Sequence, residues 1–379
     1  MRGFLKIAGL ILAAGLACAA APGARGDEAP ALPPGLSDVI GRDRSAEPVE
    51  GRSLSNDAMA SASGAYMTGD YDMALLHAER AAAGGEPRGA TLAGHILLHG
   101  LSGEADEAAA VRWLRRAADL NEPDALIILA RLAEAGRAGL DPWQAREYFS
   151  RAAEAGDGRA AHEFGLYLME RTDPGAASTA LDWLRLAAES GRTESYADYA
   201  YALGEWPHGP RDLTQARQWY ERAGEAGVPY GALMAGTMHL AGEGADPDPE
   251  RGAQLVRVAA ESGLVPAMGQ YALLLFQGAP GMAADPVNAA HWAQQGAQRG
   301  DPESQFLYAY ALAVGDGTAR DLEDAYVWAV RAGITRDGEM ADDPDRTQLE
   351  AALARALGPE ETERLNRAAR LAAAGIESR

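Results

Sequence analysis

The stretch Asp285 to Gly300 reads DPVNAAHWAQQGAQRG, and its skeleton recurs along the chain at intervals of 35 to 37 residues. Each copy can be aligned on one reference position, which is Trp292 in this stretch. The equivalent residues are His77, Trp113, Tyr148, Trp183, Trp219, Leu255, Trp292 and Trp328. So regular a period predicts a solenoid that contains about eight copies of one supersecondary unit.

Residues on both sides of the reference position predict a capped helix in each copy. Seven residues before it stand Asp70, Asp106, Asp141, Asp212, Asp248, Asp285 and Asp321, and Ala176 breaks the series. An aspartate there is suited to cap the helix, because its carboxylate accepts bonds from the free N–H groups of the first turn. Eight residues after the reference position stand Gly85, Gly156, Gly191, Gly227, Gly263 and Gly300. Glycine supplies the left-handed residue that ends a helix.

A further helix, the first of each hairpin, is predicted between successive copies. It begins at Ala90, Ala125, Ala160, Ser195, Gly231, Ala267 and Ser304. A bulky side chain follows four residues later in several copies, as at Phe164, and the next residue is small, as at Gly165. A large side chain next to a small one on the same helix lets neighbouring helices approach closely. The repeating unit is therefore predicted to be a helix hairpin that stacks on its neighbours. The reference aromatics, such as Trp219, are expected in the hairpin interfaces.

The combined pattern A-x-x-x-L-G, G-x-G, D-x-x-x-A-x-x-W and A-A-x-x-x-G resembles the Sel1-like repeat, a relative of the tetratricopeptide repeat. It is most complete from Ser304 to Ala332, where Gly315, Gly317 and Asp321 all stand in place. The resemblance implies an all-α fold, a right-handed α/α superhelical solenoid of about eight Sel1-like hairpins with a C-terminal helical cap.

The chain is expected to contain four segments. Residues 1–21 read as a signal peptide, because Arg2 and Lys6 accompany a short apolar run that is followed by small residues. Residues 22–56 lack periodicity and are rich in proline, glycine and charge, which predicts a disordered tether. The solenoid is predicted at 57–336, and the cap at 337–379 with helices over 346–357 and 359–373.

The predicted signal peptide implies a periplasmic or secreted protein without a transmembrane anchor after processing. Cys18 is the only cysteine, and it leaves two alternatives. Cleavage shortly after it gives a mature chain without any thiol. Lipidation at Cys18 is the other alternative, although the leucine usual three residues before a lipidated cysteine is missing.

Charge and lysine content narrow the classes of partner and chemistry. The net charge of -21 becomes -23 after loss of the signal peptide, because 32 basic residues then face 55 acidic ones. So acidic a chain argues against nucleic acid as a partner. Lys6 is the only lysine, so the mature chain has no lysine for a Schiff base or a general base.

No catalytic residue or cofactor site is predicted. The Gly-x-Gly pairs follow predicted helices rather than strands and recur with the repeat, which indicates turns rather than phosphate loops. His95 and His99 stand four apart, with His77 on the preceding helix, so a metal site is an open alternative. No third ligand stands at a familiar spacing, and a helix face is the simpler interpretation. Ser195 and Ser304 begin helices without any sign of a triad.

The resemblance to tetratricopeptide relatives places inward-facing positions on the first helix of each hairpin. The candidate groove residues are Arg131, His162, Leu166, Tyr201, Leu233, Leu273, Phe306 and Tyr310. Any one of them can instead rotate into the core between repeats. As a row, large apolar and aromatic side chains on one face mark a binding surface. Trp206, in the loop over 204–211, is predicted as a further exposed aromatic.

These features favour a non-enzymatic periplasmic scaffold or regulator that binds a partner protein or peptide in its concave groove, as the resemblance implies. An acidic surround suits a partner with basic segments. The alternative is a binding module for cell-wall glycan or exported polysaccharide, with groove tyrosines and Trp206 stacked on sugar rings. A hydrolase is disfavoured, because the relatives linked to β-lactam binding or hydrolysis are rich in cysteine.

Overall fold

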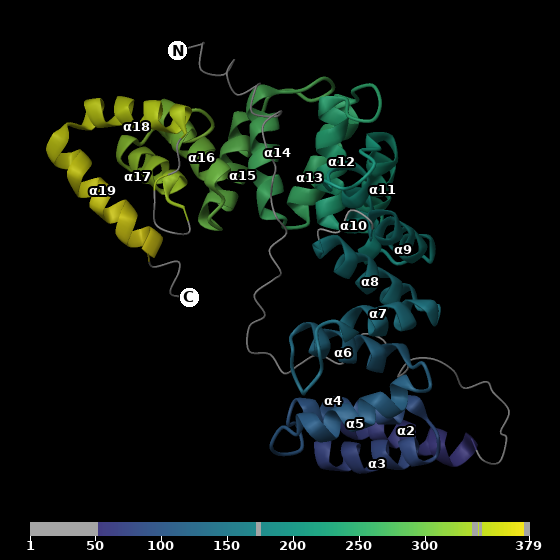
Figure 1. Cartoon of the computed structure of the whole chain (residues 1–379). Coiled ribbons are helices and arrows are strands. Elements are labelled where there is room, and N and C mark those ends of the chain that lie inside the picture. The colour runs from purple at the N-terminus through teal and green to yellow at the C-terminus, as the bar shows by residue number, and fades with distance from the viewer. Residues whose placement is uncertain (1–51, 172–175, 336–339, 341–342, 375–379) are drawn as a thin grey trace. The chain divides into compact units, whose positions relative to one another are not determined.

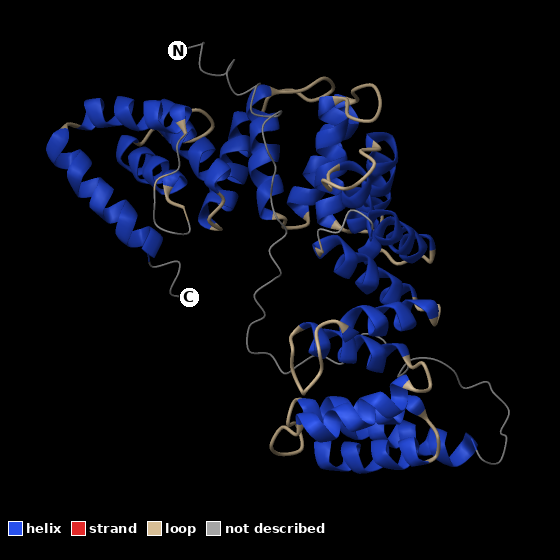
Figure 2. Ribbon diagram, in the orientation of Figure 1, coloured by secondary structure: helices blue, strands red, loops and turns tan. Residues whose placement is uncertain are grey.

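The computed structural model describes residues 52–171, 176–335, 340 and 343–374. These residues form 18 helices, and their β-structure is confined to two isolated bridges, at Ala279–Met282 and Ile334–Met340 (Figure 2). The predicted signal peptide and the predicted tether up to residue 51 lie outside the described residues. The first described helix begins at Arg52, so the end of the predicted tether is helical.

The described chain divides into two compact units. The N-terminal unit comprises residues 52–199 and 207–209. Its helices are α2 (Arg52–Met67), α3 (Tyr71–Ala83), α4 (Pro87–Leu98), α5 (Glu107–Ala118), α6 (Pro123–Glu134), α7 (Gln144–Glu154), α8 (Gly158–Glu170), α9 (Ala177–Glu189) and the first part of α10 (Glu194–Gly204) (Figure 1). From α2 to α9 each helix packs against the next, so the unit is a stack of four hairpins.

The C-terminal unit comprises residues 200–206 and 210–374. After the end of α10 it contains α11 (Leu213–Glu225), α12 (Pro229–Ala241), α13 (Pro249–Glu261), α14 (Val265–Gln277), α15 (Pro286–Gln298), α16 (Pro302–Val314), α17 (Leu322–Gly333), α18 (Pro344–Leu357) and α19 (Pro359–Ala374). Successive helices again pack against one another. The all-helical prediction is confirmed, as are the two helices predicted after the last hairpin.

The predicted aspartate caps begin six of the second helices. The carboxylates of Asp70, Asp106, Asp212, Asp248, Asp285 and Asp321 each accept a backbone N–H from the first turn. Asp141 is the exception, because α7 begins only at Gln144. There the side-chain Oε1 of Gln144 accepts the Asp141 N–H at 3.0 Å, and no capping bond comes from Asp141.

The predicted glycines end these helices as expected. The six glycines eight residues after the reference position have φ between 84° and 90°. In the second hairpin Asn121 takes the same place with φ 57°, a conformation that asparagine tolerates better than most residues. The local signals of the repeat therefore fix both ends of the helix.

The core of each hairpin is centred one residue after the reference aromatic. Leu114, Phe149, Leu184, Tyr220 and Val256 have no exposed surface. Trp219 itself is half-buried, which corrects the expectation that it fills the interface. The facing first helix has a glycine where this buried side chain packs against it. A Cβ atom added to Gly94 would lie only 2.7 Å from Leu114 Cγ, so a larger residue would clash there. Gly165 and Gly236 meet Leu184 and Val256 in the same way.

Three of the reference aromatics, Trp113, Trp219 and Trp328, instead stack with arginines three residues later on the same helix. The guanidinium of Arg222 lies 4.4 Å from the ring centre of Trp219, and that of Arg331 lies 4.2 Å from Trp328. Arginines of this series also join successive hairpins. Arg116 donates to the Ala82 carbonyl at 2.9 Å, and Arg151 donates to the Ala118 carbonyl at 2.6 Å. The arginines thus satisfy carbonyls at the preceding helix end.

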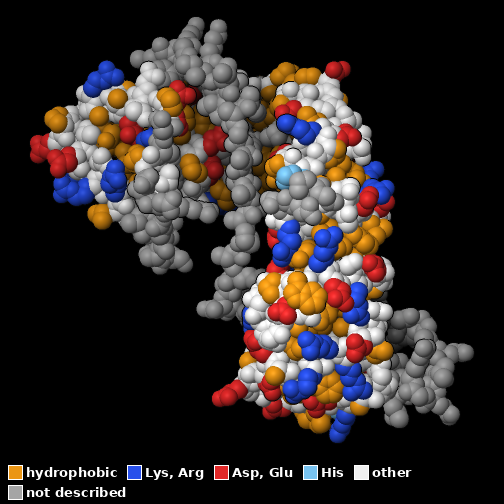
Figure 3. Space-filling view, viewed as in Figure 1, with side chains coloured by type: hydrophobic (Ala, Val, Ile, Leu, Met, Phe, Trp, Pro, Cys, Tyr) orange, Lys and Arg blue, Asp and Glu red, His pale blue; other side chains and the backbone are white. Residues whose placement is uncertain are grey.

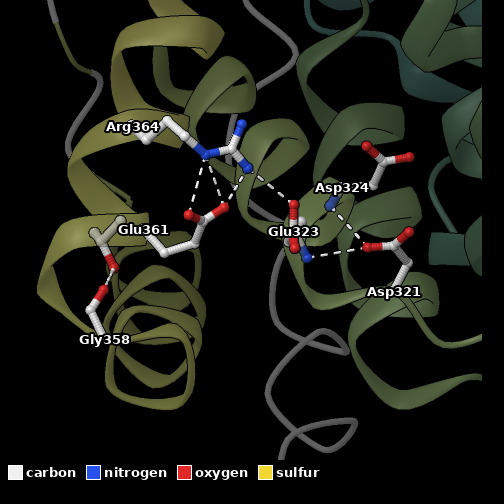
Figure 4. Close-up of polar contacts among 7 residues, drawn as sticks. Asp321, Glu323, Asp324, Gly358, Glu361 and Arg364 are labelled. Atoms are coloured by element: carbon white, nitrogen blue, oxygen red, sulfur yellow. Dashed lines mark hydrogen bonds and ion pairs between the residues drawn. The ribbon is translucent and has the colours of Figure 1, made fainter.

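The last two helices cover the final hairpin of the C-terminal unit. Leu353 of α18 and Leu365 of α19 join a buried cluster with Tyr326 and Val330 of α17. A polar contact supports the docking: Arg364 of α19 pairs with Glu361 on its own helix and with Glu323 of α17 at 3.0 Å (Figure 4). The two helices therefore protect apolar surface that a further repeat would otherwise cover.

Candidate functional site

The eight predicted groove residues lie on the first helices of successive hairpins, at two equivalent positions. We call them the row residues. Arg131, His162 and Leu166 belong to the N-terminal unit, and Tyr201, Leu233, Leu273, Phe306 and Tyr310 belong to the C-terminal unit. The later position carries Arg131, Leu166, Tyr201, Leu273 and Tyr310, and the earlier one carries His162, Leu233 and Phe306.

Exposure separates these residues. Arg131 and Tyr201 are exposed, the latter at 37%, and Leu166, Phe306 and Tyr310 are half-buried. His162 and Leu273 retain 9% exposure, and Leu233 retains 2% within a core cluster that includes Val256 and Met268. Leu233 therefore serves packing, and the later position carries most of the accessible surface of the row.

In the N-terminal unit the polar row residues contact acidic neighbours. Arg131 of α6 pairs with Glu134 at 3.0 Å and with Glu163 of α8. Its guanidinium also lies 5.2 Å from the ring centre of Phe149. Arg171 extends the network to Glu134 at 3.5 Å. Burial lowers the pKa of Arg131, but the adjacent carboxylates raise it overall, so the cation is firmly held.

His162 is engaged in a second polar contact of the same unit. Its Nε2 lies 2.7 Å from Asp198 Oδ2 on α10. Ser195 lies one turn before Asp198, but its hydroxyl is fully buried and makes no hydrogen bond. A serine–histidine–aspartate relay is therefore not assembled here, because the hydroxyl must contact the histidine. Figure 3 shows acidic and basic side chains interspersed over the N-terminal unit.

The C-terminal unit presents its row residues in apolar surroundings. Leu273 of α14 packs with Ala293 and Leu307, and Phe276 lies against this cluster from the same helix. Phe306 and Tyr310 follow on α16, which packs against α14. Val314, one further turn along α16, is 46% exposed. We define Leu273, Phe276, Phe306, Tyr310 and Val314 as the α14–α16 face.

Trp206 is not the exposed aromatic that its loop suggested. It retains only 5% exposure. The backbone N–H of Trp206 donates to the Tyr201 carbonyl at 3.0 Å, and the backbone N–H of Asp212 donates to the Leu203 carbonyl at 2.9 Å. These bonds fold the loop back onto the end of α10, which buries the indole. Trp143, before α7, is exposed at 70% instead.

The three histidines considered for a metal lie at the start of the N-terminal unit. His95 is buried, its Nε2 lies 3.2 Å from the Tyr66 hydroxyl, and its ring centre lies 4.6 Å from that of His99. Burial, with a smaller contribution from His99, lowers the pKa of His95 to about 4. Across the described residues, no three histidine, cysteine, aspartate or glutamate side chains are grouped to hold a metal ion.

One unpaired acid lies beside the α14–α16 face. Glu303 stands in the first turn of α16, and burial, together with repulsion from Asp301, raises its pKa to about 7. Asp301 is occupied as the helix cap, with its Oδ2 2.8 Å from the Ser304 N–H.

The described helices include none that is both long and apolar enough to cross a membrane.

Comparison with known proteins identifies the repeat. The family model described as Sel1 repeat matches eight consecutive stretches, at residues 53–86, 87–122, 123–157, 158–191, 194–228, 229–264, 265–301 and 302–333. Each stretch holds one hairpin, from α2–α3 to α16–α17. The matched residues cover most of the chain.

Two related sequences share part of this array. An uncharacterized protein of Neisseria meningitidis serogroup B is 27% identical over 224 residues, which are 51% of this chain and 46% of the relative. The chitin synthase regulator SKT5 of Saccharomyces cerevisiae is 26% identical over 282 residues, which are 73% of this chain and 36% of the relative. The chain thus spans less than half the length of either relative.

Two crystal structures share the fold. A Sel1 repeat protein from Oxalobacter formigenes superimposes with a TM-score of 0.62 and 22% identity, covering 80% of this chain and 90% of that one. The protective antigen c5321 of uropathogenic Escherichia coli, which displays an SLR fold, gives 0.54 and 19%, covering 86% and 87%. Identities this low establish the fold alone.

Proposed function

Because the chain belongs to the Sel1 repeat family, we propose that it is a non-enzymatic scaffold that binds a partner protein or peptide through the row residues of its C-terminal unit. The observation that carries the proposal is the accessibility of Tyr201 and Tyr310 at the later row position, and of Phe306 at the earlier one. Aromatic side chains supply large contact area at low entropic cost, and they are common binding hot spots. The hairpin cores themselves require the residue after the reference aromatic rather than these rings.

The family relationship supports a binding function rather than chemistry. Repeat arrays offer extended surfaces to partners. One relative is, by its name, a regulator of chitin synthase, which agrees with a regulatory scaffold. Burial of Trp206 removes one of the aromatic platforms that a glycan-binding function required. The protein partner is therefore the better supported alternative.

We also propose that the protein is exported to the periplasm or to the outside of the cell. The charged start, the short apolar run and the small residues that follow it support a signal peptide over 1–21. Sequencing of the mature N-terminus from fractionated cells tests this part. Recovery of intact Met1 on the cellular protein would contradict export through this segment.

The binding function is tested by affinity capture with the mature chain and a Tyr201→Ala, Tyr310→Ala double variant. We expect at least tenfold weaker capture of the native partner, because single hot spots contribute about 2 kcal/mol or more. The thermal midpoint should change little, since both side chains retain surface exposure. Tyr148→Ala, a half-buried tyrosine of α7 outside the row, is the matched control. Equal capture by all three proteins would exclude the row as the binding site.

A further inference from the structure

Helix α16 presents an ordered stripe of side chains beside the α14–α16 face. Glu303, Phe306, Tyr310 and Val314 follow the spacing i, i+3, i+7 and i+11, so they share one side of the helix. Asp316 follows the left-handed C-cap Gly315 and lies close enough to raise the pKa of Tyr310, after the larger effect of burial. The stripe therefore reads acid, three apolar or aromatic side chains, acid.

Neither acid at the ends of this stripe is neutralised within the described chain. Glu303 and Asp316 form no ion pair with any residue that the structure describes. Glu303 is half-buried, and the nearest charge that acts on it is the like charge of Asp301. A carboxylate held in this way gains from an added cation, because burial and like charge both oppose its ionisation.

In the N-terminal unit, by contrast, acidic side chains next to the row residues have partners within the chain. There Glu163 pairs with Arg131 of the neighbouring first helix, and Asp198 lies against His162. These two acids are thus paired within the chain itself. Among the described residues, Glu303 and Asp316 make no such pair.

We propose that the α14–α16 face binds a segment of another protein in which apolar side chains lie between two basic residues. The apolar side chains contact Phe306 and Tyr310, and the basic residues pair with Glu303 and Asp316. This inference rests on the proposed function and adds the chemistry of the partner. It also sets a spacing, because the two acids stand near the two ends of α16, whose 13 residues span about 20 Å at 1.5 Å per residue. An extended partner spans that distance with about six residues.

Fluorescein-labelled peptides provide the test. The matched probe carries two arginines six residues apart with leucine and serine alternating between them. One companion replaces both arginines by glutamate, and another places the two arginines side by side. A further probe has the arginines thirteen residues apart and suits a helical partner. Anisotropy titrations against the full mature chain then give the affinity of each probe.

We expect the matched probe, or the helical one, to bind at least tenfold more tightly than the glutamate probe and several-fold more tightly than the adjacent-arginine probe. Glu303→Gln and Asp316→Asn should each weaken binding about fivefold, and Tyr310→Ala about tenfold. Glu360→Gln, an exposed acid at the start of α19, is the matched control and should leave the affinity unchanged. Unchanged thermal midpoints confirm that each variant is folded.

The outcomes separate this inference from the proposed function. If arginine and glutamate probes bind equally and both depend on Tyr310, the face binds peptides but the charge rule is wrong. If no probe binds while the double tyrosine variant still loses the native partner, the partner chemistry proposed here is wrong and the binding row stands. Equal affinity of Glu303→Gln, Asp316→Asn and the parent chain would likewise overturn the inference.

Discussion

The two units place different chemistry at the same repeat positions. In the N-terminal unit the row contains Arg131 and His162, whose charges or polar atoms are satisfied by Glu163 and Asp198. In the C-terminal unit it contains Phe306 and Tyr310 beside unpaired acids. Both units share the hairpin, the caps and the buried residue after the reference aromatic. Arg131 and His162 thus make contacts within the chain, and we propose that Phe306 and Tyr310 are left for a partner.

The largest expected effect is the loss of a buried aromatic of the C-terminal unit. Trp206→Ala should lower the free energy of unfolding by about 3 to 5 kcal/mol, because the indole is almost fully buried. Trp143→Ala removes an indole that is 70% exposed and should cost well under about 1 kcal/mol. Urea unfolding of the two variants measures the contrast. Similar losses would show that the loop over 204–211 does not bury Trp206 in solution.

The next largest expected effect is the loss of stability when a buried ion pair of the N-terminal unit is broken. Asp124 pairs with Arg159, and both side chains are 8% exposed. Asp124→Ala removes the carboxylate that faces a buried guanidinium and should cost about 3 kcal/mol of unfolding free energy. Asp182→Ala breaks the exposed pair with Arg185 and should cost less than about 1 kcal/mol. A small loss for Asp124→Ala would mean that the N-terminal unit does not depend on this pair.

A buried histidine should make the N-terminal unit sensitive to acid. The pKa of His95 falls from 6.5 to about 4, so the unfolded chain binds the proton more readily and stability is lost as pH falls between those values. The full loss is roughly 3 kcal/mol. Tyr66 of α2 and His99, the C-cap of α4, face the ring, and Arg137 faces His99. His95→Gln should abolish this part of the pH dependence.

The measurement compares unfolding free energies of the parent and His95→Gln between pH 7 and pH 4. Carboxylates titrate in both proteins, so their contribution cancels in the difference. That difference should shrink by roughly 3 kcal/mol on acidification. Parallel curves would show that His95 is not buried as a neutral ring.

The repeat could be predicted because its signals are local. An aspartate before a helix, such as Asp248, and a glycine after it, such as Gly263, act within one turn, so spacing alone determines helix ends. The order of hairpins follows from the period. Even here Asp141 departs from the rule, because Gln144 bonds back to its N–H.

What the sequence did not determine depends on contacts between distant residues. Trp206 stands in a polar loop, and its burial follows from backbone bonds to α10. Trp219 and Tyr220 carry equally strong aromatic signals, yet only Tyr220 is fully buried. The recurring arginine three residues after the reference position was available as a signal. Its stacking and its carbonyl bonds identify it as structural.

The smallest expected effect tests the comparison most directly. Arg131→Ala breaks exposed ion pairs with Glu134 and Glu163, and such pairs contribute about 0 to 1 kcal/mol. The variant should therefore lose little stability and capture the native partner as well as the parent chain does, since the N-terminal row is engaged within the chain. The Tyr201→Ala, Tyr310→Ala variant should lose at least tenfold in the same assay. If Arg131→Ala weakens capture as strongly as the tyrosine variant, both units contact the partner, and the division of the row into a cohesive half and a binding half is wrong.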